Sequence, residues 1–93
     1  MNAIIVYDIP DDRLRAKVAD ICLDYGLQRI QYSAFLGTLA PSRQEELLMK
    51  IKKRAGKKEA NVQIFPICER CWAKRQVWVQ KAKKKASPSG SAT

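Results

Sequence analysis

The sequence contains no histidine, three cysteines and no long apolar run. Without histidine, no imidazole is present to act as a general base, so any hydrolytic activity has to rely on a water activated by a metal. Three cysteines do not make a disulfide framework, and no stretch has the length of a membrane span or the features of a signal peptide. These absences predict a cytoplasmic protein with reduced thiols and no membrane contact.

Acidic residues are also scarce, and the excess of positive charge is confined to the second half of the chain. The 93 residues carry 18 lysines and arginines against 9 aspartates and glutamates. Residues 1–46 contain five basic and seven acidic side chains, whereas residues 47–93 contain thirteen basic and two acidic ones. Such a one-sided distribution is typical of proteins that bind the phosphate backbone of nucleic acids. The alternative is a solvated lysine-rich surface followed by a charged tail.

Hydrophobic periodicity and turn residues predict the secondary structure. Apolar side chains spaced by three and four predict a helix over residues 11–25, followed by Gly26. Pro41 and the capping box Ser42-x-x-Glu45 predict the start of a second helix, which ends at Gly56. Alternating or β-branched segments predict strands over residues 3–9, 28–37, 61–67 and 76–80.

The order of these elements indicates an α+β protein: a ferredoxin-like βαββαβ sandwich with an extra short C-terminal strand. Right-handed crossovers place both helices on one face of the sheet and leave the other face bare. A bare face in so short a chain is expected to be covered by a second copy, so the protein should dimerise through the sheet face. The domain is expected to span residues 1–82, followed by a disordered basic and serine-rich tail over residues 83–93.

Residues 28–37 alternate in character and are interpreted as one long strand. The side predicted to face the core is formed by Ile30, Tyr32, Ala34 and Leu36. The opposite, mixed side is formed by Arg29, Gln31, Ser33 and Phe35. Phe35 is therefore expected on the bare face of the sheet.

Asp8 closes an apolar strand, where a carboxylate costs desolvation energy unless it is solvated, paired or bound to a cation. One interpretation is an acidic residue at the turn into the first helix. The other is a ligand of Mg²⁺, which usually takes one or two carboxylates together with waters and phosphate. Because one carboxylate is a poor site, a two-fold dimer that brings a second Asp8 close would complete it.

Several cations are candidates for phosphate contact. Arg13, Arg15 and Lys17 open the first helix, where they either meet a phosphate or pair with Asp11, Asp12 and Asp20. Arg29 suits bidentate contact with phosphate. The basic run around Gly56 adds further candidates: Lys50, Lys53, Arg54 and Lys57.

The pair Cys68-x-x-Cys71 supplies two thiols, half of a structural zinc site, so four thiolates would require two copies of the chain. A redox role is disfavoured because the motif does not follow a first strand into a helix. Trp72 and Trp78 lie among cations and are interpreted as interface residues, with stacking on bases as the alternative.

Several segments, in this order over about residues 1–80, together resemble one known family. They are Val6-Tyr7-Asp8-Ile9, Asp12-Arg13 with Arg15-x-Lys17-Val18, Tyr25-Gly26, Arg29-x-Gln31-Tyr32-Ser33-x-Phe35-x-Gly37 and Pro66-Ile67-Cys68. The family is the CRISPR-associated (Cas) endoribonuclease family numbered two, the small adaptation subunit of the spacer-acquisition complex. The chain resembles more distantly a toxin-type ribonuclease family of the same fold.

The resemblance implies a ferredoxin-like homodimer in which the C-terminal strand pairs with the sheet of the other protomer. It implies that Asp8 of both protomers coordinates Mg²⁺ for cleavage of phosphodiesters in RNA or DNA, in a cleft that Arg15, Arg29, Ser33 and Phe35 line. It also implies a scaffold that bridges dimers of the CRISPR-associated integrase subunit on protospacer DNA. With one carboxylate per chain, we expect backbone binding to be robust and cleavage to be slow or conditional.

Overall fold

The computed structural model describes residues 1–82, and its elements follow the predicted βαββαβ order. The strands are β1 (Asn2–Asp8), β2 (Gln28–Gln31), β3 (Ala34–Thr38) and β4 (Asn61–Ile67). The helices are α1 (Asp12–Asp24), α2 (Pro41–Ala55) and α3 (Glu69–Ala73). The predicted tail, residues 83–93, lies outside the described residues.

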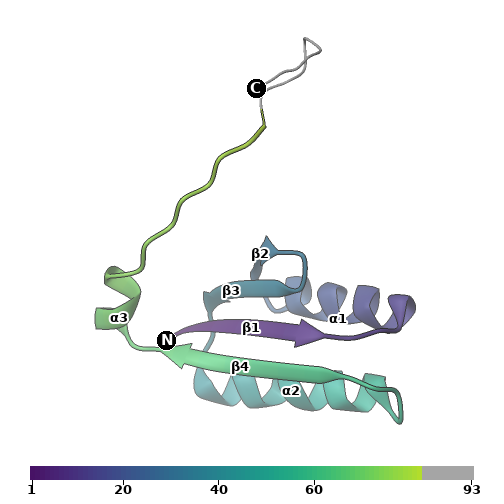
Figure 1. The fold of residues 1–93 in the computed structure, drawn as a ribbon. Helices are drawn as coiled ribbons and strands as arrows, with labels where there is room; N and C mark the ends of the chain where they lie inside the picture. The colour runs from purple at the N-terminus through teal and green to yellow at the C-terminus, as the bar shows by residue number, and fades with distance from the viewer. Residues whose placement is uncertain (83–93) are drawn as a thin grey trace.

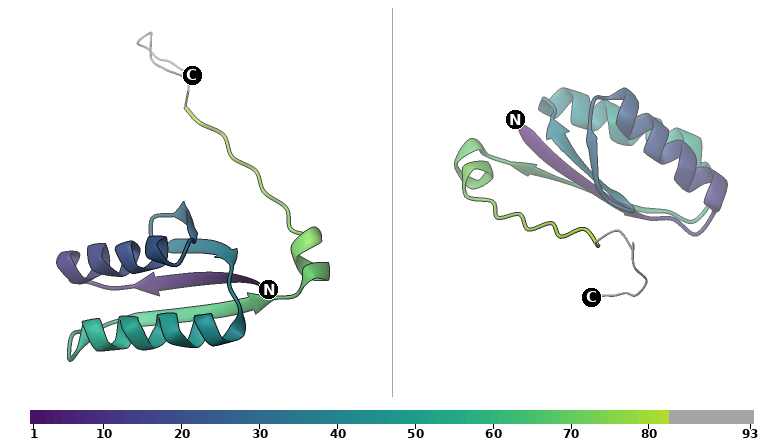
Figure 2. Two further views of the ribbon diagram at one scale, coloured as in Figure 1. Left: turned by 180° about the vertical axis from the view of Figure 1, so that it is seen from behind. Right: turned by 90° about the horizontal axis from the view of Figure 1, so that it is seen from above.

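The four strands form one antiparallel sheet in the order β2-β3-β1-β4. β1 lies in the interior, between β3 and β4, and β2 and β4 form the two edges. Helices α1 and α2 both cover the same face of the sheet and leave the other face open (Figures 1 and 2). This arrangement confirms the predicted ferredoxin-like α+β fold, including the bare face.

The core lies between the sheet and the two long helices, and β1 shows how the sequence builds it. Ala3, Ile5 and Tyr7 point toward the helices and are buried, whereas Ile4 and Val6 point to the open face and are half-buried. The helices contribute apolar side chains that are also fully buried: Val18, Cys22, Leu47 and Ile51. Burying each large apolar side chain contributes about 1.5–3 kcal/mol, so this layer holds the domain together.

Helix α1 has the caps that its sequence predicts. The Asp11 carboxylate accepts a hydrogen bond from the backbone N–H of Leu14 at 2.8 Å, which satisfies a free donor of the first turn. At the other end Gly26 has a φ of 81°, and the N–H of Leu27 donates to the carbonyl of Cys22 at 3.1 Å. A left-handed residue at this position favours glycine, so Gly26 ends the helix.

The expectation of one long strand over residues 28–37 is wrong. The chain reverses at Tyr32 and Ser33, so that β2 and β3 form a hairpin, and the register shifts between Arg29 and Gln31. Phe35 faces the helices, with 0% of its surface exposed, and its ring stacks against that of Tyr7 with the centroids 6.3 Å apart. The assignment of the two faces was therefore inverted: Phe35 belongs to the core.

Two further expectations about local structure are corrected. No side chain caps the start of α2: Ala40 is the N-cap and Pro41 occupies the first turn, so the predicted capping box is absent. Residues 76–80 form no strand within the described chain; instead the five-residue α3 follows β4, and an extended segment leads away from it. Residues 74–82 leave α3 on the side of the sheet opposite α1 and α2 (Figure 2).

No helix in the described part of the chain combines the length and the apolar character that crossing a membrane requires.

Candidate functional site

Asp8 is the last residue of β1, on the open face of the sheet. It lies on the same side as Ile4 and Val6, because side chains alternate along a strand, and it is paired in register with Asn61 of β4. Asp8 is exposed and forms no ion pair or side-chain hydrogen bond with any residue in the range 1–82. Its carboxylate is therefore accessible to a cation.

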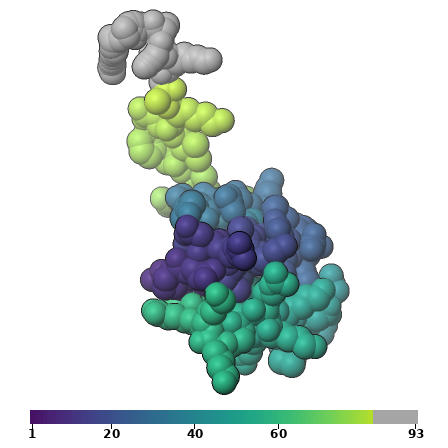
Figure 3. Space-filling model, turned by 90° about the vertical axis from the view of Figure 1, so that its right-hand side faces the viewer, coloured from purple at the N-terminus to yellow at the C-terminus, as the bar shows by residue number. Residues whose placement is uncertain are grey.

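Figure 3 looks onto the end of the domain where β1 ends and α1 begins. The surface of this region lies between the connection from α2 to β4 on one side and the β2–β3 hairpin on the other. Segments far apart in the sequence therefore surround the end of β1.

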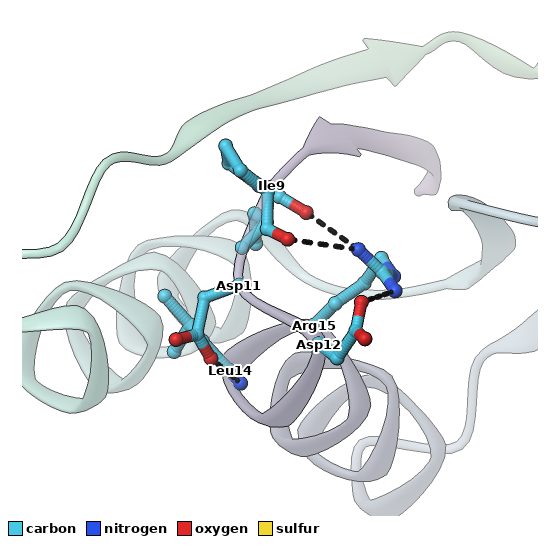
Figure 4. Close-up of polar contacts among 6 residues, drawn as sticks. Ile9, Asp11, Asp12, Leu14 and Arg15 are labelled. Carbon is cyan, nitrogen blue, oxygen red and sulfur yellow. Dashed lines mark hydrogen bonds and ion pairs between the residues drawn. The ribbon is translucent and has the colours of Figure 1, made fainter.

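Arg15 holds the loop that follows Asp8 (Figure 4). Its guanidinium donates to the carbonyl of Ile9 at 2.8 Å and to that of Pro10 at 3.5 Å, and it forms an ion pair with Asp12. The side chain is 22% exposed. Of the two interpretations drawn from the sequence for Arg15, pairing within the chain is the one observed.

Asp11 and Asp12 both have partners within the chain. Asp11 accepts from the Leu14 N–H and pairs with the ammonium of Lys58 at 2.9 Å, while Asp12 pairs with Arg15. The backbone N–H of Leu14, and then the hydrogen bond from Lys58, hold the pKa of Asp11 below its usual value. The contact with Lys58 has no signal in the sequence, because 47 residues separate the two side chains.

Ser33 lies in the turn of the β2–β3 hairpin, next to the end of β1. Its carbonyl accepts a hydrogen bond of 3.0 Å from the N–H of Tyr7, the residue before Asp8. The neighbouring Tyr32 is 69% exposed, and the guanidinium of Arg15 lies 5.4 Å from the centre of its ring. The structure therefore brings together Asp8, Ser33 and Arg15, and adds Tyr32, which the alternation of residues 28–37 had placed in the core.

Phe35 does not line a cleft in this structure, because it is buried under the helices. Arg29 is paired in register with Phe35 and lies on the same side of the sheet, with its guanidinium 5.2 Å from the centre of the Phe35 ring. The expected position of Phe35 on the open face is wrong because the alternation was assigned to the wrong sides of the sheet.

The remaining predicted cations are exposed, on two helices. Arg13 and Lys17 lie on α1. The other four are spaced so that they share one side of a helix, and they lie on α2 or just after it: Lys50, Lys53, Arg54 and Lys57. We call these four residues the α2 basic face. Because α2 covers the sheet on the side away from Asp8, Lys50, Lys53 and Arg54 do not lie on the face that carries this carboxylate (Figure 2). Lys57 belongs to the connection from α2 to β4, which borders the end of β1.

The side chains near the end of β1 show whether this region could hold the expected Mg²⁺ ion. Residues 1–82 contain no group of three or more His, Cys, Asp or Glu side chains that could hold a metal ion. Within this described range, Asp8 is the acidic side chain near the end of β1 that has no partner, since Asp11 and Asp12 are paired. One carboxylate together with waters and phosphates fits Mg²⁺, and two carboxylates across a dimer axis fit it better.

The described residues form a small ferredoxin-like domain with one sheet face open, and the Asp8 carboxylate at the end of its first strand has no partner among them. The protein therefore belongs to the class of small α+β proteins with a ferredoxin-like fold. Comparison with known proteins narrows it: residues 1–75 match the family described as CRISPR associated protein Cas2. A relative from Chloroflexus aurantiacus, named CRISPR-associated endoribonuclease Cas2 2, is 49% identical over 80 residues, which cover 86% of this chain and 94% of the relative.

Two other similar proteins add to this. A protein of Thermoproteus tenax, named a CRISPR-associated endonuclease Cas1/endonuclease Cas2 fusion, is 43% identical over 70 residues, or 75% of this chain and 26% of the fusion. The crystal structure of Streptococcus pyogenes Cas2 has the same fold, with a TM-score of 0.70 and 19% identity over 85% of this chain and 100% of that one. The chain belongs to the Cas2 family, and its function is CRISPR-associated.

Proposed function

We propose that the protein is a cytoplasmic homodimer that binds nucleic acid during spacer acquisition and cleaves phosphodiester bonds in a reaction that depends on Asp8 and Mg²⁺. The observation that carries the proposal is the exposed carboxylate of Asp8 at the end of β1, which has no partner among residues 1–82. The names of similar proteins, which include CRISPR-associated endoribonuclease, support the nuclease part of the proposal.

Asp8 is the residue that would hold Mg²⁺, together with Asp8 of a second copy. When bound there, Mg²⁺ would supply positive charge that stabilises the phosphate in the transition state and favours attack by water. Arg15 contributes indirectly, because its bonds to the carbonyls of Ile9 and Pro10 fix the backbone next to Asp8. Arg13 and Lys17 are exposed and would bind phosphate oxygens of the substrate.

The second candidate function is a scaffold without catalysis, which bridges dimers of the integrase subunit on protospacer DNA. The α2 basic face favours it, because it is exposed and its three residues within α2 lie on the face of the sheet opposite Asp8, where they would bind a nucleic-acid backbone without bringing it to the carboxylate. The Thermoproteus tenax fusion supports a partnership with the integrase subunit, since Cas1 and Cas2 are joined in that protein.

Cleavage assays with Asp8→Ala distinguish these two functions. Wild type, Asp8→Ala and the control Asp20→Ala are incubated with single-stranded RNA or duplex DNA, in Mg²⁺ or in EDTA. Asp20 is an exposed carboxylate on α1, so its loss should leave cleavage intact. The nuclease proposal predicts that cleavage disappears with EDTA and with Asp8→Ala. Cleavage that persists in both would contradict it, and unchanged binding without cleavage by any variant would favour the scaffold.

Dimerisation is proposed from the open face of the sheet. Ile4, Val6 and Leu36 are half-buried there, and Phe65 is 49% exposed, so an apolar surface lies beside Asp8 without a cover from α1 or α2. The extended segment beyond α3 adds Trp78, which is 82% exposed. Residues 76–80 form no strand within one chain, and we propose that they become one on dimerisation, by pairing with the free edge of β4 in the second copy.

Light scattering tests the dimer across micromolar concentrations. A mass near twice 10.6 kDa is expected for wild type, and Phe65→Glu or a chain ending at residue 75 should shift the mass toward the monomer. Met49→Glu is the control, because Met49 is an exposed apolar residue of α2, the helix that covers the opposite face of the sheet (Figure 2). A mass near 10.6 kDa for wild type throughout would refute the dimer.

A further inference from the structure

The two cysteines of the Cys68-x-x-Cys71 motif lie where a strand leads directly into a helix. β4 ends at Ile67, Cys68 is the N-cap of α3, and Cys71 lies within the helix. The sequence disfavours a redox role because the motif does not follow a first strand into a helix. The structure places the motif after β4, the last strand, and shows that a helix, α3, does follow that strand directly.

The geometry brings the two thiols to the same turn. The sulfur of Cys68 accepts a hydrogen bond of 3.5 Å from the backbone N–H of Cys71. The two side chains also interact with each other directly, so the thiols lie on the same side of this turn. Both cysteines are exposed, whereas Cys22 is buried between α1 and the sheet. A disulfide reagent in solution can therefore reach Cys68 and Cys71 but not Cys22.

The surroundings distinguish the two thiols chemically. The backbone N–H of Cys71, followed by its side chain, lowers the pKa of Cys68, and the interaction with Cys68 raises the pKa of Cys71. Burial raises the pKa of Cys22 to about 12. Because the thiolate is the nucleophile, Cys68 is the sulfur that attacks first.

We propose that Cys68 and Cys71 form a dithiol site that exchanges with low-molecular-weight disulfides and closes to an intramolecular disulfide. The proposal goes beyond nucleic-acid binding and cleavage, and none of its steps involves Asp8.

The small disulfide itself is the oxidant that this reaction requires. The Cys68 thiolate attacks one sulfur of the small disulfide, which forms a mixed disulfide and releases one small thiolate. The Cys71 thiolate then attacks the sulfur of Cys68, which forms the Cys68–Cys71 bond and releases the second small thiolate. The protein loses two protons and two electrons, and the small disulfide is reduced to two thiols.

The site lies at the connection between the domain and its C-terminal segment. Residues 74–82 leave the domain from the end of α3 (Figure 1). There the guanidinium of Arg75 donates to the carbonyl of Trp72 at 2.9 Å and lies 3.9 Å from the centre of the Trp72 ring. A bond between Cys68 and Cys71 replaces the sulfur hydrogen bond at the start of α3 by a covalent link. Oxidation would therefore fix the turn from which this segment leaves.

Mass spectrometry of the full chain tests the proposal. The reduced protein is incubated with oxidised glutathione in EDTA, quenched in acid and weighed intact. We expect a loss of two hydrogen atoms with no glutathione attached. Trypsin cuts after Arg70, between the two cysteines, so the two resulting peptides should stay joined until a reductant is added.

Three variants complete the test. Cys71→Ser should retain one glutathione on Cys68, Cys68→Ser should react several-fold more slowly, and the control Cys22→Ala should behave as wild type. The proposal is overturned if wild type accumulates two glutathiones, if disulfides form between chains instead, or if the mass does not change.

Discussion

The guanidinium of Arg15 donates a hydrogen bond of 2.8 Å to the carbonyl of Ile9, the residue that directly follows Asp8. This carbonyl lies just beyond the end of β1, where the sheet offers it no partner. From the sequence, this cation was expected to bind phosphate or to pair with acidic neighbours. In the structure it also fixes the backbone that presents Asp8.

Arg15→Lys tests this structural role. It keeps the positive charge but removes the planar guanidinium, which donates to two backbone carbonyls and a carboxylate at once. We expect the melting temperature to fall by several degrees and Asp8-dependent cleavage to fall with it. Arg13→Lys is the matched control, since Arg13 is exposed on the same turn of α1 and should tolerate the change. If Arg15→Lys left stability unchanged and weakened nucleic-acid binding, Arg15 would be a phosphate contact instead.

The second prediction concerns the dependence of stability on pH at Asp11. Its pKa is lowered in the folded protein, first by the Leu14 N–H and then by Lys58. A carboxyl of this kind stabilises the fold above its unfolded pKa, and the contribution is lost as pH falls through the folded pKa. Asp11→Asn keeps a capping acceptor but removes the charge. We expect Asp11→Asn to have a lower melting temperature than wild type at pH 7. This difference in melting temperature should disappear as the pH falls below about 4, where the Asp11 carboxyl of wild type becomes protonated.

Thermal unfolding between pH 7 and pH 2 measures this gap. Lys58→Gln should reproduce part of the loss at pH 7, because it removes the second cause of the lowered pKa. Asp20→Asn serves as the control, since its carboxylate is exposed and forms no ion pair among the described residues. A gap between Asp11→Asn and wild type that stayed constant down to pH 2 would show that the charge of Asp11 does not stabilise the fold.

The sequence predicted those features that depend on near neighbours. The strand over residues 61–67 was placed at its observed bounds, and the first helix within one residue of its observed ends. Gly26 has the left-handed backbone that its position predicted. Each of these depends on local patterns, namely apolar spacing, β-branched runs or a glycine after an apolar stripe.

The features that were missed at the site depend on distant segments. Alternation along residues 28–37 correctly put Arg29 and Phe35 on one side, but periodicity does not reveal which side packs under the helices. The contact between Asp11 and Lys58 joins opposite halves of the chain. The position of Asp8 on the open face follows from the same tertiary packing, so no sequence pattern indicated that the α2 basic face lies elsewhere.

The third prediction concerns the hydroxyl of Tyr7. It is buried and forms no hydrogen bond of normal geometry among the described residues. Burial raises the pKa of Tyr7, and the nearby guanidinium of Arg29 opposes that effect without closing a hydrogen bond to the hydroxyl. The ring itself packs against Phe35. A buried polar group without a partner costs about 1–3 kcal/mol, and the ring contacts do not depend on the hydroxyl. We therefore expect Tyr7→Phe to raise the free energy of unfolding by about 1 kcal/mol, measured by urea denaturation.

Phe35→Leu provides the comparison, since it replaces the other ring of the stacked pair by a smaller side chain and should lower stability through weaker packing. A decrease in stability for Tyr7→Phe would show that the hydroxyl has a partner that stabilises the folded state, either the guanidinium of Arg29 or an ordered water.

The last prediction concerns the α2 basic face. If its four cations bind phosphates, each contact releases counterions, and the logarithm of the binding constant falls steeply with the logarithm of salt concentration. Replacing Lys50, Lys53, Arg54 and Lys57 together by glutamine should weaken binding to duplex DNA and reduce this slope by up to about four, one for each cation removed. Lys52→Gln is the control, because Lys52 is exposed on the same helix but points away from this row. If the salt dependence of binding were unchanged in the fourfold variant, the α2 basic face would be a solvated surface that does not contact DNA. Arg13 and Lys17, on the other long helix, would then remain as the proposed contacts with the DNA backbone.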